Sequence, residues 1–198
     1  MITAMVTALL AAAPRRTLMQ STEYFFNVRE SIVEEWVNAI FASYPLQTTG
    51  FLRTVKDPFT NPVADMTREA ANVVYEAVSG WDKKPAEVRS AIDRFIHLRA
   101  VQNFLPSQAM LVFYLLKPLM RKHIMPGMVK DGKLKDYLEA ESRLDTIVLL
   151  GFDMYTKSRE VVAENRIKEI KSQHAQLVRW AQRMGTDEIP GLDKLAED

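Results

Sequence analysis

The helical spacing of apolar residues is the feature that most constrains the fold of this chain. Between residues 25 and 40 large apolar residues recur every three or four positions, at Phe25, Val28, Ile32, Trp36 and Ile40. This is the period of one face of an α-helix, and it returns in later segments, whereas the alternation of a half-buried strand appears nowhere. Only 7 of the 198 residues are glycine, which argues against an all-β architecture. The sequence therefore predicts an all-α fold with five to seven helices.

Proline, glycine and asparagine mark several expected helix boundaries. Asn61-Pro62 is typical of a helix start, because Asn caps free backbone N–H groups and Pro suits the first helical position. Ser79-Gly80 predicts the end of that helix. A further helix is expected to begin at Pro106 and to kink near Pro118. Turns are expected at Pro126-Gly127 and Asp131-Gly132, and a bend at Gly151.

The expected core centres on a run of apolar residues from 109 to 116. A helix that is apolar all round is predicted to be buried in the middle of the fold. The aromatic side chains expected in the core are Trp36, Phe95, Phe104, Phe113 and Tyr114.

Composition excludes several classes of function. Lys and Arg number 26 against 25 Asp and Glu, so the net charge of +1 does not favour a nucleic-acid partner. The absence of cysteine excludes disulfides, thiolate metal sites and a cysteine nucleophile. Glycine-rich phosphate loops, nucleophile elbows and paired-histidine metal motifs are also missing. We therefore expect a protein that is not an enzyme and has neither a metal nor a cofactor.

No segment is expected to cross a membrane. The longest uncharged stretch after the N-terminus, residues 100–116, is too short and too polar for a span. Residues 1–13 are uncharged and mostly apolar, but Arg15 and Arg16 follow this stretch rather than precede it, unlike a secretory signal. Export after a cut at Ala13 is the alternative, which Pro14 disfavours. We expect a cytoplasmic protein whose residues 1–20 form an apolar segment or helix.

The last helical segment shows a different, narrower pattern. Apolar or weakly polar residues are spaced alternately four and three apart over three heptads, at Ala163, Ile167, Ile170, His174, Leu177, Ala181 and Met184. The positions between them are mostly charged, so the stripe is too narrow for a globular core and fits a seam between two helices. We expect this seam to pair two copies of the chain, with His174 able to set the register. The alternative is a single amphipathic helix on the domain surface.

Two further candidates for a functional site lie around residue 100. Polar residues cluster between two apolar helices, at Arg99, Gln102, Asn103, Ser107 and Gln108. Because buried polar groups need partners, we expect them to bond one another or free helix ends, or else to line a pocket for a small ligand. His97 on the preceding helix is a candidate haem ligand, and the alternative is a hydrogen-bonded structural histidine.

Short motifs in a fixed order resemble those of a known family. They are Glu35-Trp36, Tyr44-Pro45, Phe59-Thr60-Asn61-Pro62-Val63, Arg99-Ala100-Val101-Gln102-Asn103-Phe104, Pro106-Ser107-Gln108-Ala109, Glu141-Ser142-Arg143-Leu144-Asp145 and Phe152-Asp153-Met154-Tyr155. Over roughly residues 25–170 the chain resembles the RsbRD-type N-terminal domain of RsbT co-antagonist proteins. The resemblance implies a globin-like helical sensor of the kind found, without haem, in bacterial stressosomes, where a long helix leads to a STAS output domain.

The resemblance implies the following organisation and function. Residues 21–158 would form the sensor domain, 159–185 a connecting and dimerising helix, and 186–198 a tail. Since only 14 residues follow Met184, we expect no STAS domain after it. The leading hypothesis is a dimeric, non-enzymatic regulatory module that relays the binding of an unidentified ligand or regulatory protein through its last helix. The alternative is a globin-like protein that binds haem or an apolar small molecule.

Overall fold

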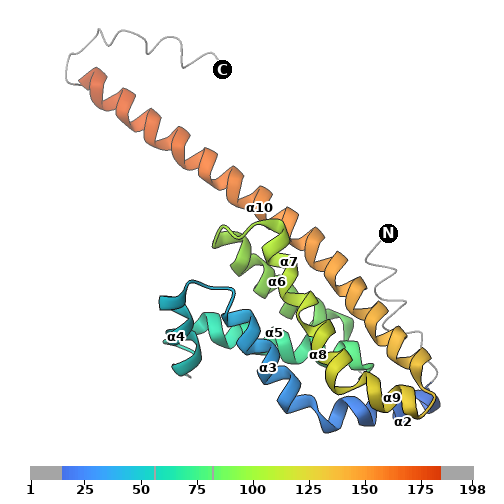
Figure 1. Cartoon of the computed structure of the whole chain (residues 1–198). Coiled ribbons are helices and arrows are strands. Elements are labelled where there is room, and N and C mark those ends of the chain that lie inside the picture. The colour runs from blue at the N-terminus through green and yellow to red at the C-terminus, as the bar shows by residue number, and fades with distance from the viewer. Residues whose placement is uncertain (1–14, 56, 82, 184–198) are drawn as a thin grey trace. The chain divides into compact units, whose positions relative to one another are not determined.

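All regular secondary structure in the described part of the chain is helical, as the sequence predicts. The computed structural model describes residues 15–55, 57–81 and 83–183, and no strand occurs among them (Figure 1). The helices are α2 (Arg15–Asn27), α3 (Arg29–Phe41), α4 (Leu46–Thr54), α5 (Pro62–Ser79), α6 (Pro85–Val101), α7 (Pro106–Tyr114), α8 (Leu116–His123), α9 (Met125–Lys130) and α10 (Leu134–Arg183). In this part of the chain, every helix is too short or too polar to traverse a bilayer. The expected segment 1–20 lies largely outside the described residues.

Several helix boundaries lie where local chemistry places them. The Asn61 side chain accepts a hydrogen bond from the backbone N–H of Ala64 at 3.2 Å and so caps α5. Gly80 ends α5 with a φ of 81°, a left-handed conformation that favours glycine. Helices α6 and α7 each begin with a proline, Pro85 and Pro106. These boundaries were predictable because each depends on residues within one turn.

The described residues form more helices than the five to seven expected, because the chain also breaks at points where no break was predicted. Val28 separates α2 from α3, and Leu115 separates α7 from α8. The expected kink near Pro118 is displaced to Leu115, since the proline ring crowds the carbonyl four residues earlier. The prediction of a turn at Pro126-Gly127 is wrong, because both residues lie inside α9. The turn at Asp131-Gly132 is confirmed by the φ of 70° at Gly132.

The structure divides into two units, residues 1–158 and 159–198. In the first unit α5 packs against α6, and α3 packs against both α5 and α8. Residues of α10 before 158 complete this core with Tyr137, Leu144 and Ile147. Gly151, where a bend was expected, lies inside α10. A Cβ there would lie 3.0 Å from the Phe113 ring, so glycine admits that ring.

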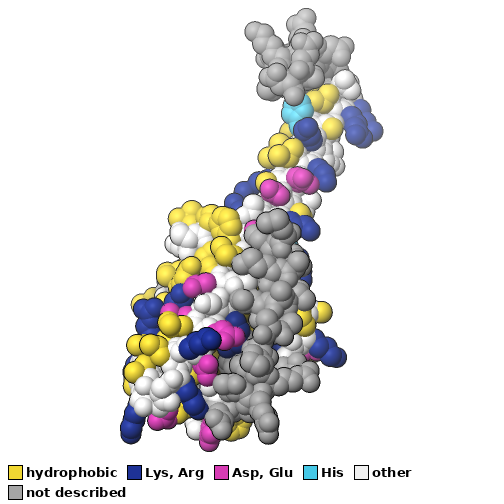
Figure 2. All heavy atoms as spheres, turned by 90° about the vertical axis from the view of Figure 1, so that its right-hand side faces the viewer, with side chains coloured by type: hydrophobic (Ala, Val, Ile, Leu, Met, Phe, Trp, Pro, Cys, Tyr) yellow, Lys and Arg dark blue, Asp and Glu magenta, His cyan; other side chains and the backbone are white. Residues whose placement is uncertain are grey.

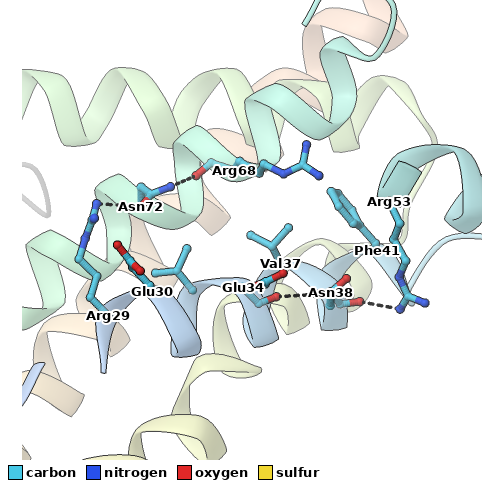
Figure 3. Close-up of a pocket in the computed structure, with 10 residues that line it drawn as sticks. Arg29, Glu30, Glu34, Val37, Asn38, Phe41, Arg53, Arg68 and Asn72 are labelled. Atoms are coloured by element: carbon cyan, nitrogen blue, oxygen red, sulfur yellow. Dashed lines mark hydrogen bonds between the residues drawn. The ribbon is translucent and has the colours of Figure 1, made fainter. Parts of the chain in front are cut away.

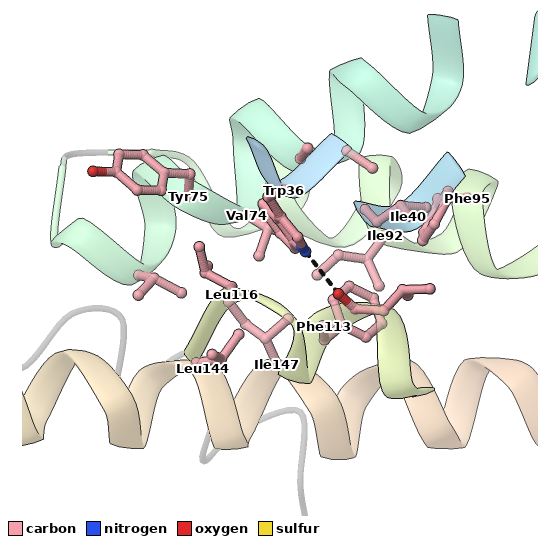
Figure 4. Packing of buried hydrophobic residues seen from close by; sticks show 14 of the residues in the cluster. Trp36, Ile40, Val74, Tyr75, Ile92, Phe95, Phe113, Leu116, Leu144 and Ile147 are labelled. Carbon is pink, nitrogen blue, oxygen red and sulfur yellow. Dashed lines mark hydrogen bonds between the residues drawn. The ribbon is translucent and has the colours of Figure 1, made fainter. Parts of the chain in front are cut away.

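Trp36 lies in the middle of the first unit's core. Its indole Nε1 donates a 2.7 Å hydrogen bond to the carbonyl of Val112, which ties α3 to α7 (Figure 4). Phe95 and Phe113 meet edge to face with ring centroids 6.1 Å apart. Trp36, Phe95 and Phe113 are buried as predicted, and Phe104 is partly buried.

The expectation that residues 109–116 are buried all round is wrong. Tyr114 is 43% exposed and Leu111 is 51% exposed, so α7 has one solvent-facing side. Tyr114 was expected in the core, but its ring lies 5.5 Å from the ammonium group of Lys117 at the surface. An aromatic residue with a polar end is stable in such a half-exposed position.

Candidate functional site

The end of α6 forms a polar corner that turns the chain toward α7. The backbone N–H of Phe104 donates to the Arg99 carbonyl at 3.3 Å, and that of Asn103 donates to the Ala100 carbonyl at 3.4 Å. Asn103 has a φ of 60°, the left-handed conformation that completes this helix-ending motif. The corner therefore has a defined backbone geometry that places Phe104 beside the last turn of α6.

Arg99 is fully buried beneath this corner. Its relative exposure is 0%, and its Nη2 donates to the Ser43 hydroxyl and the Gln108 carbonyl, both at 3.3 Å. Its Nε and Nη1 have no hydrogen-bond partner, and no carboxylate of the described residues lies within ion-pair distance. Burial lowers the pKa of Arg99 below its ordinary value, but an arginine keeps its charge in proteins. The corner thus holds a buried and uncompensated positive charge.

Three aromatic rings surround the Arg99 guanidinium. The guanidinium carbon lies 3.8 Å from the centroid of the Phe104 ring, 5.5 Å from that of Tyr44 and 5.8 Å from that of Phe95. Ring faces attract a cation electrostatically, so this cage offsets part of the cost of burial.

A second buried arginine, Arg143, differs from Arg99 in its partners. Arg143 of α10 donates from Nε to the carbonyl of Val78 at 2.9 Å, near the end of α5. Its Nη1 also pairs with Glu139 at 3.4 Å. A cation is favoured at a helix C-terminus, where free carbonyls accumulate. Arg143 therefore has a carbonyl and a carboxylate as partners, whereas Arg99 has no anionic partner among the described residues.

A cavity of about 440 Å³, the corner pocket, opens beside the Arg99 cage. Its lining is mostly apolar and comes from α4, from the segments flanking it, and from the α6–α7 corner: Tyr44, Pro45, Thr48, Phe51, Leu52, Thr60, Asn61, Pro62, Val63, Gln102 and Phe104. Two of the three rings of the cage, those of Tyr44 and Phe104, line this pocket. The Tyr44 hydroxyl donates to the Gln102 side chain at 3.0 Å, and burial raises the pKa of Tyr44, so it stays a neutral donor.

The five residues predicted as a polar cluster have different surroundings. Only Arg99 is buried; Gln102, Asn103, Ser107 and Gln108 are exposed. Gln102 lines the corner pocket, while the Gln108 side chain accepts a hydrogen bond from the Leu105 N–H at 3.0 Å and so caps the start of α7. The pair that the structure brings together at the pocket is therefore Gln102, which lines it, and Arg99, which lies behind its wall.

Sequence reasoning missed most of the pocket lining. Tyr44 and Asn61 lie about 40 to 60 residues before Gln102, and only the tertiary fold joins them. A signal was present, since the motifs Tyr44-Pro45 and Asn61-Pro62-Val63 were already noted for the family resemblance. Nothing in their spacing indicated a shared cavity.

His97 does not take part in this site. It lies exposed on α6 and lines neither the corner pocket nor the groove between α3 and α5. An axial haem ligand needs an enclosed pocket around the imidazole, and the structure places none of the described cavities there.

The groove between α3 and α5 is a second cavity, of about 330 Å³ (Figure 3). Charged residues of both signs line it, namely Arg29, Glu30, Glu34, Arg53 and Arg68. Arg29 is already paired, since its Nη2 contacts Glu76 at 2.7 Å and Asn72 at 2.8 Å. With its charges mixed in this way, the groove is less selective for one class of ligand than the corner pocket.

In the second unit, hydrophobic side chains stand uncovered among charged ones (Figure 2). Three of the predicted seam residues are largely exposed: Ile167 is 52%, Ile170 58% and Leu177 63% exposed. Ala163 is also exposed, His174 is half-buried and Ala181 is buried, while Met184 lies outside the described residues. The large members of the stripe are therefore unpartnered in a single chain.

Comparisons with known proteins agree with the motifs. No solved structure matches the chain. An uncharacterized protein from Archaeoglobus fulgidus is 25% identical over 142 residues, which is 71% of this chain and 83% of that relative. The family model described as "RsbT co-antagonist protein rsbRD N-terminal domain" matches residues 30–170, most of the chain. This is a family of regulatory domains without known catalytic activity, and the chain belongs to it.

Proposed function

We propose that the chain is a homodimeric regulatory module of the stressosome type. Two copies pair along residues 163–184, and α10 relays a change of state in the first unit to the paired segment. The family supports a regulatory role, and the exposed stripe of Ile167, Ile170 and Leu177 is the observation that carries the dimer.

Pairing would cover apolar side chains that a single chain leaves exposed. Fully burying one such side chain contributes about 1.5–3 kcal/mol, so covering a half-exposed one contributes about 1 kcal/mol. Ile167, Ile170 and Leu177 of each copy would contribute in this way. Because association also costs translational and rotational freedom, we expect a reversible dimer rather than an obligate one.

The relay rests on the continuity of α10. The same helix carries core residues of the first unit, such as Leu144 and Ile147, and all described seam residues. A ligand or partner that binds two states of the first unit unequally shifts their populations. We propose that a separate regulatory protein reads the outcome.

Sedimentation equilibrium of the full chain tests the dimer. We expect the average mass of the wild type to rise with concentration from that of one chain, 22.6 kDa, toward twice that value. Ile170→Lys places a charge in the seam of both copies and should give the single-chain mass. Ser172→Lys adds the same charge at an exposed position between seam residues and should leave the dimer intact. A wild type that remains monomeric, or an unchanged mass for Ile170→Lys, would contradict the proposal.

A further inference from the structure

We infer that the corner pocket binds a small amphipathic carboxylate, with the anionic group on Arg99 and the apolar part against the pocket walls. This deepens the proposed function, because it names the class of ligand that the first unit would sense. The dimer and this site involve different residues, so either can be wrong without the other.

The first argument is the unbalanced charge of Arg99. Burying an ion costs several kcal/mol unless an opposite charge and hydrogen bonds compensate it. Arg143 in the same unit has a carbonyl and a carboxylate partner. The described partners of Arg99 are neutral, namely the Ser43 hydroxyl and the Gln108 carbonyl at 3.3 Å and the Tyr44 hydroxyl, while its Nε and Nη1 have no hydrogen-bond partner. A carboxylate would supply the missing acceptors and the missing charge.

The second argument is access from the corner pocket. The rings of Phe104 and Tyr44 contact the guanidinium and also line the pocket, so they form the wall between the two. The backbone of Phe104 is held on both sides: its N–H bonds the Arg99 carbonyl, and its carbonyl accepts the Tyr155 hydroxyl. The backbone is fixed, so the movement that exposes Arg99 is a rotation of the half-buried Phe104 side chain.

The third argument fixes the chemical class of the ligand. Among the residues that the structure describes, no charged side chain lines the corner pocket, so Arg99 is the one described cation that an entering anion meets there. A single cation matches a carboxylate better than a phosphate, whose charge at neutral pH approaches −2. The amide of Asn61 is already used, since it donates to the carbonyls of Phe51, Leu52 and Val55. The remaining surface is largely apolar, from residues such as Leu52 and Val63, and suits a short hydrocarbon body.

Isothermal titration calorimetry of the full chain with three eight-carbon probes tests the inference. Octanoate, 1-octanol and octylamine share one apolar body and differ in charge. We expect octanoate to bind at least tenfold more tightly than octanol, and octylamine to bind more weakly than octanol. In Arg99→Met the advantage of octanoate should disappear while octanol binds as before, which also shows that the pocket is still folded.

Two further variants and a map of the site complete the test. Arg94→Met removes an exposed arginine from the same helix and should leave the affinity for octanoate unchanged. Arg99→Lys keeps a charge and should retain part of the preference for octanoate over octanol. Amide chemical shifts should move chiefly in residues 44–52, 60–63 and 99–108. Equal binding of octanoate and octanol, an unchanged octanoate affinity in Arg99→Met, or no binding of octanoate at millimolar concentration would overturn the inference.

Discussion

Replacing each of the two buried arginines with methionine should have very different effects on the stability of the ligand-free protein. Methionine is an unbranched, flexible apolar side chain that adapts to irregular core spaces. The substitution therefore removes the charge and the donors of Arg99 or Arg143 while keeping much of the packing volume. The difference between the two variants then reports what each guanidinium contributes.

Arg143→Met should be clearly destabilising. It removes the 2.9 Å hydrogen bond to the Val78 carbonyl and the pairing with Glu139, and it leaves that buried carbonyl without its charged donor. Hydrogen bonds to charged groups contribute about 1.5–3 kcal/mol, so we expect a loss of about 3 kcal/mol. For a chain of this size that lowers Tm by about 6–12 °C.

Arg99→Met should lower the free energy of unfolding by no more than about 1 kcal/mol, because removing an unpaired buried ion also removes the cost of its desolvation. The two 3.3 Å bonds to Ser43 and Gln108 are at or beyond the long end of the usual range, so their loss is small. The substitution also removes the attraction of the guanidinium to the aromatic rings, about 0.5–2 kcal/mol. This loss is offset because methionine carries no charge whose burial costs free energy.

Urea unfolding of the full chain, followed by circular dichroism, measures both variants against the wild type. We expect Arg143→Met to be at least about 2 kcal/mol less stable than Arg99→Met, from the difference between the two losses above. If Arg99→Met costs as much as Arg143→Met, Arg99 is a structural tie like its counterpart, and the reasoning from its uncompensated charge is refuted.

Two other predictions concern the fold. Trp36→Phe removes the indole donor and leaves the buried Val112 carbonyl unpaired, so urea unfolding should show a free energy of unfolding lower by about 2–3 kcal/mol. Trp180→Phe, at an exposed position, should change that free energy little, and equal effects of the two substitutions would contradict the role of this bond. Bonding to Arg121 lowers the pKa of Glu141 below its ordinary 4.5, so its contribution to stability is complete above that value and is lost as the pH falls through the lowered pKa. The urea midpoints of the wild type and Glu141→Gln should therefore differ at pH 7 and converge as the pH falls through the lowered pKa of Glu141. A difference that grows on acidification would contradict the assignment.

The parts of the fold that sequence reasoning predicted are those set by local chemistry. The cap at Asn61, the end of α5 at Gly80 and the start of α7 at Pro106 each follow from residues within one turn. The break at Val28 was not predicted, because it lies inside a continuous apolar pattern. The break at Leu115 follows from the predicted effect of Pro118, displaced toward the carbonyl that the proline ring crowds.

The candidate site was predictable only in part. Arg99 was singled out because an arginine beside an apolar helix face needs partners, and the structure places it in an aromatic cage. Its neighbour Tyr44 reaches it only through the tertiary fold, whereas Phe104 is placed beside it by the local turn that ends α6. Tyr114 was misplaced in the core because an aromatic residue at helical spacing fits a buried face and a half-exposed one equally well.

The pairing of two copies through the last helix is the central claim, and single-cysteine cross-linking tests it most directly. The chain has no cysteine, so a disulfide in the His174→Cys variant can join only two copies at position 174. If the seam pairs two chains with His174 at its middle, this variant should oxidise at micromolar concentration to a covalent dimer on a non-reducing gel. Ser172→Cys, outside the seam, should remain largely monomeric. Cross-linking of His174→Cys no faster than that of Ser172→Cys would contradict the account.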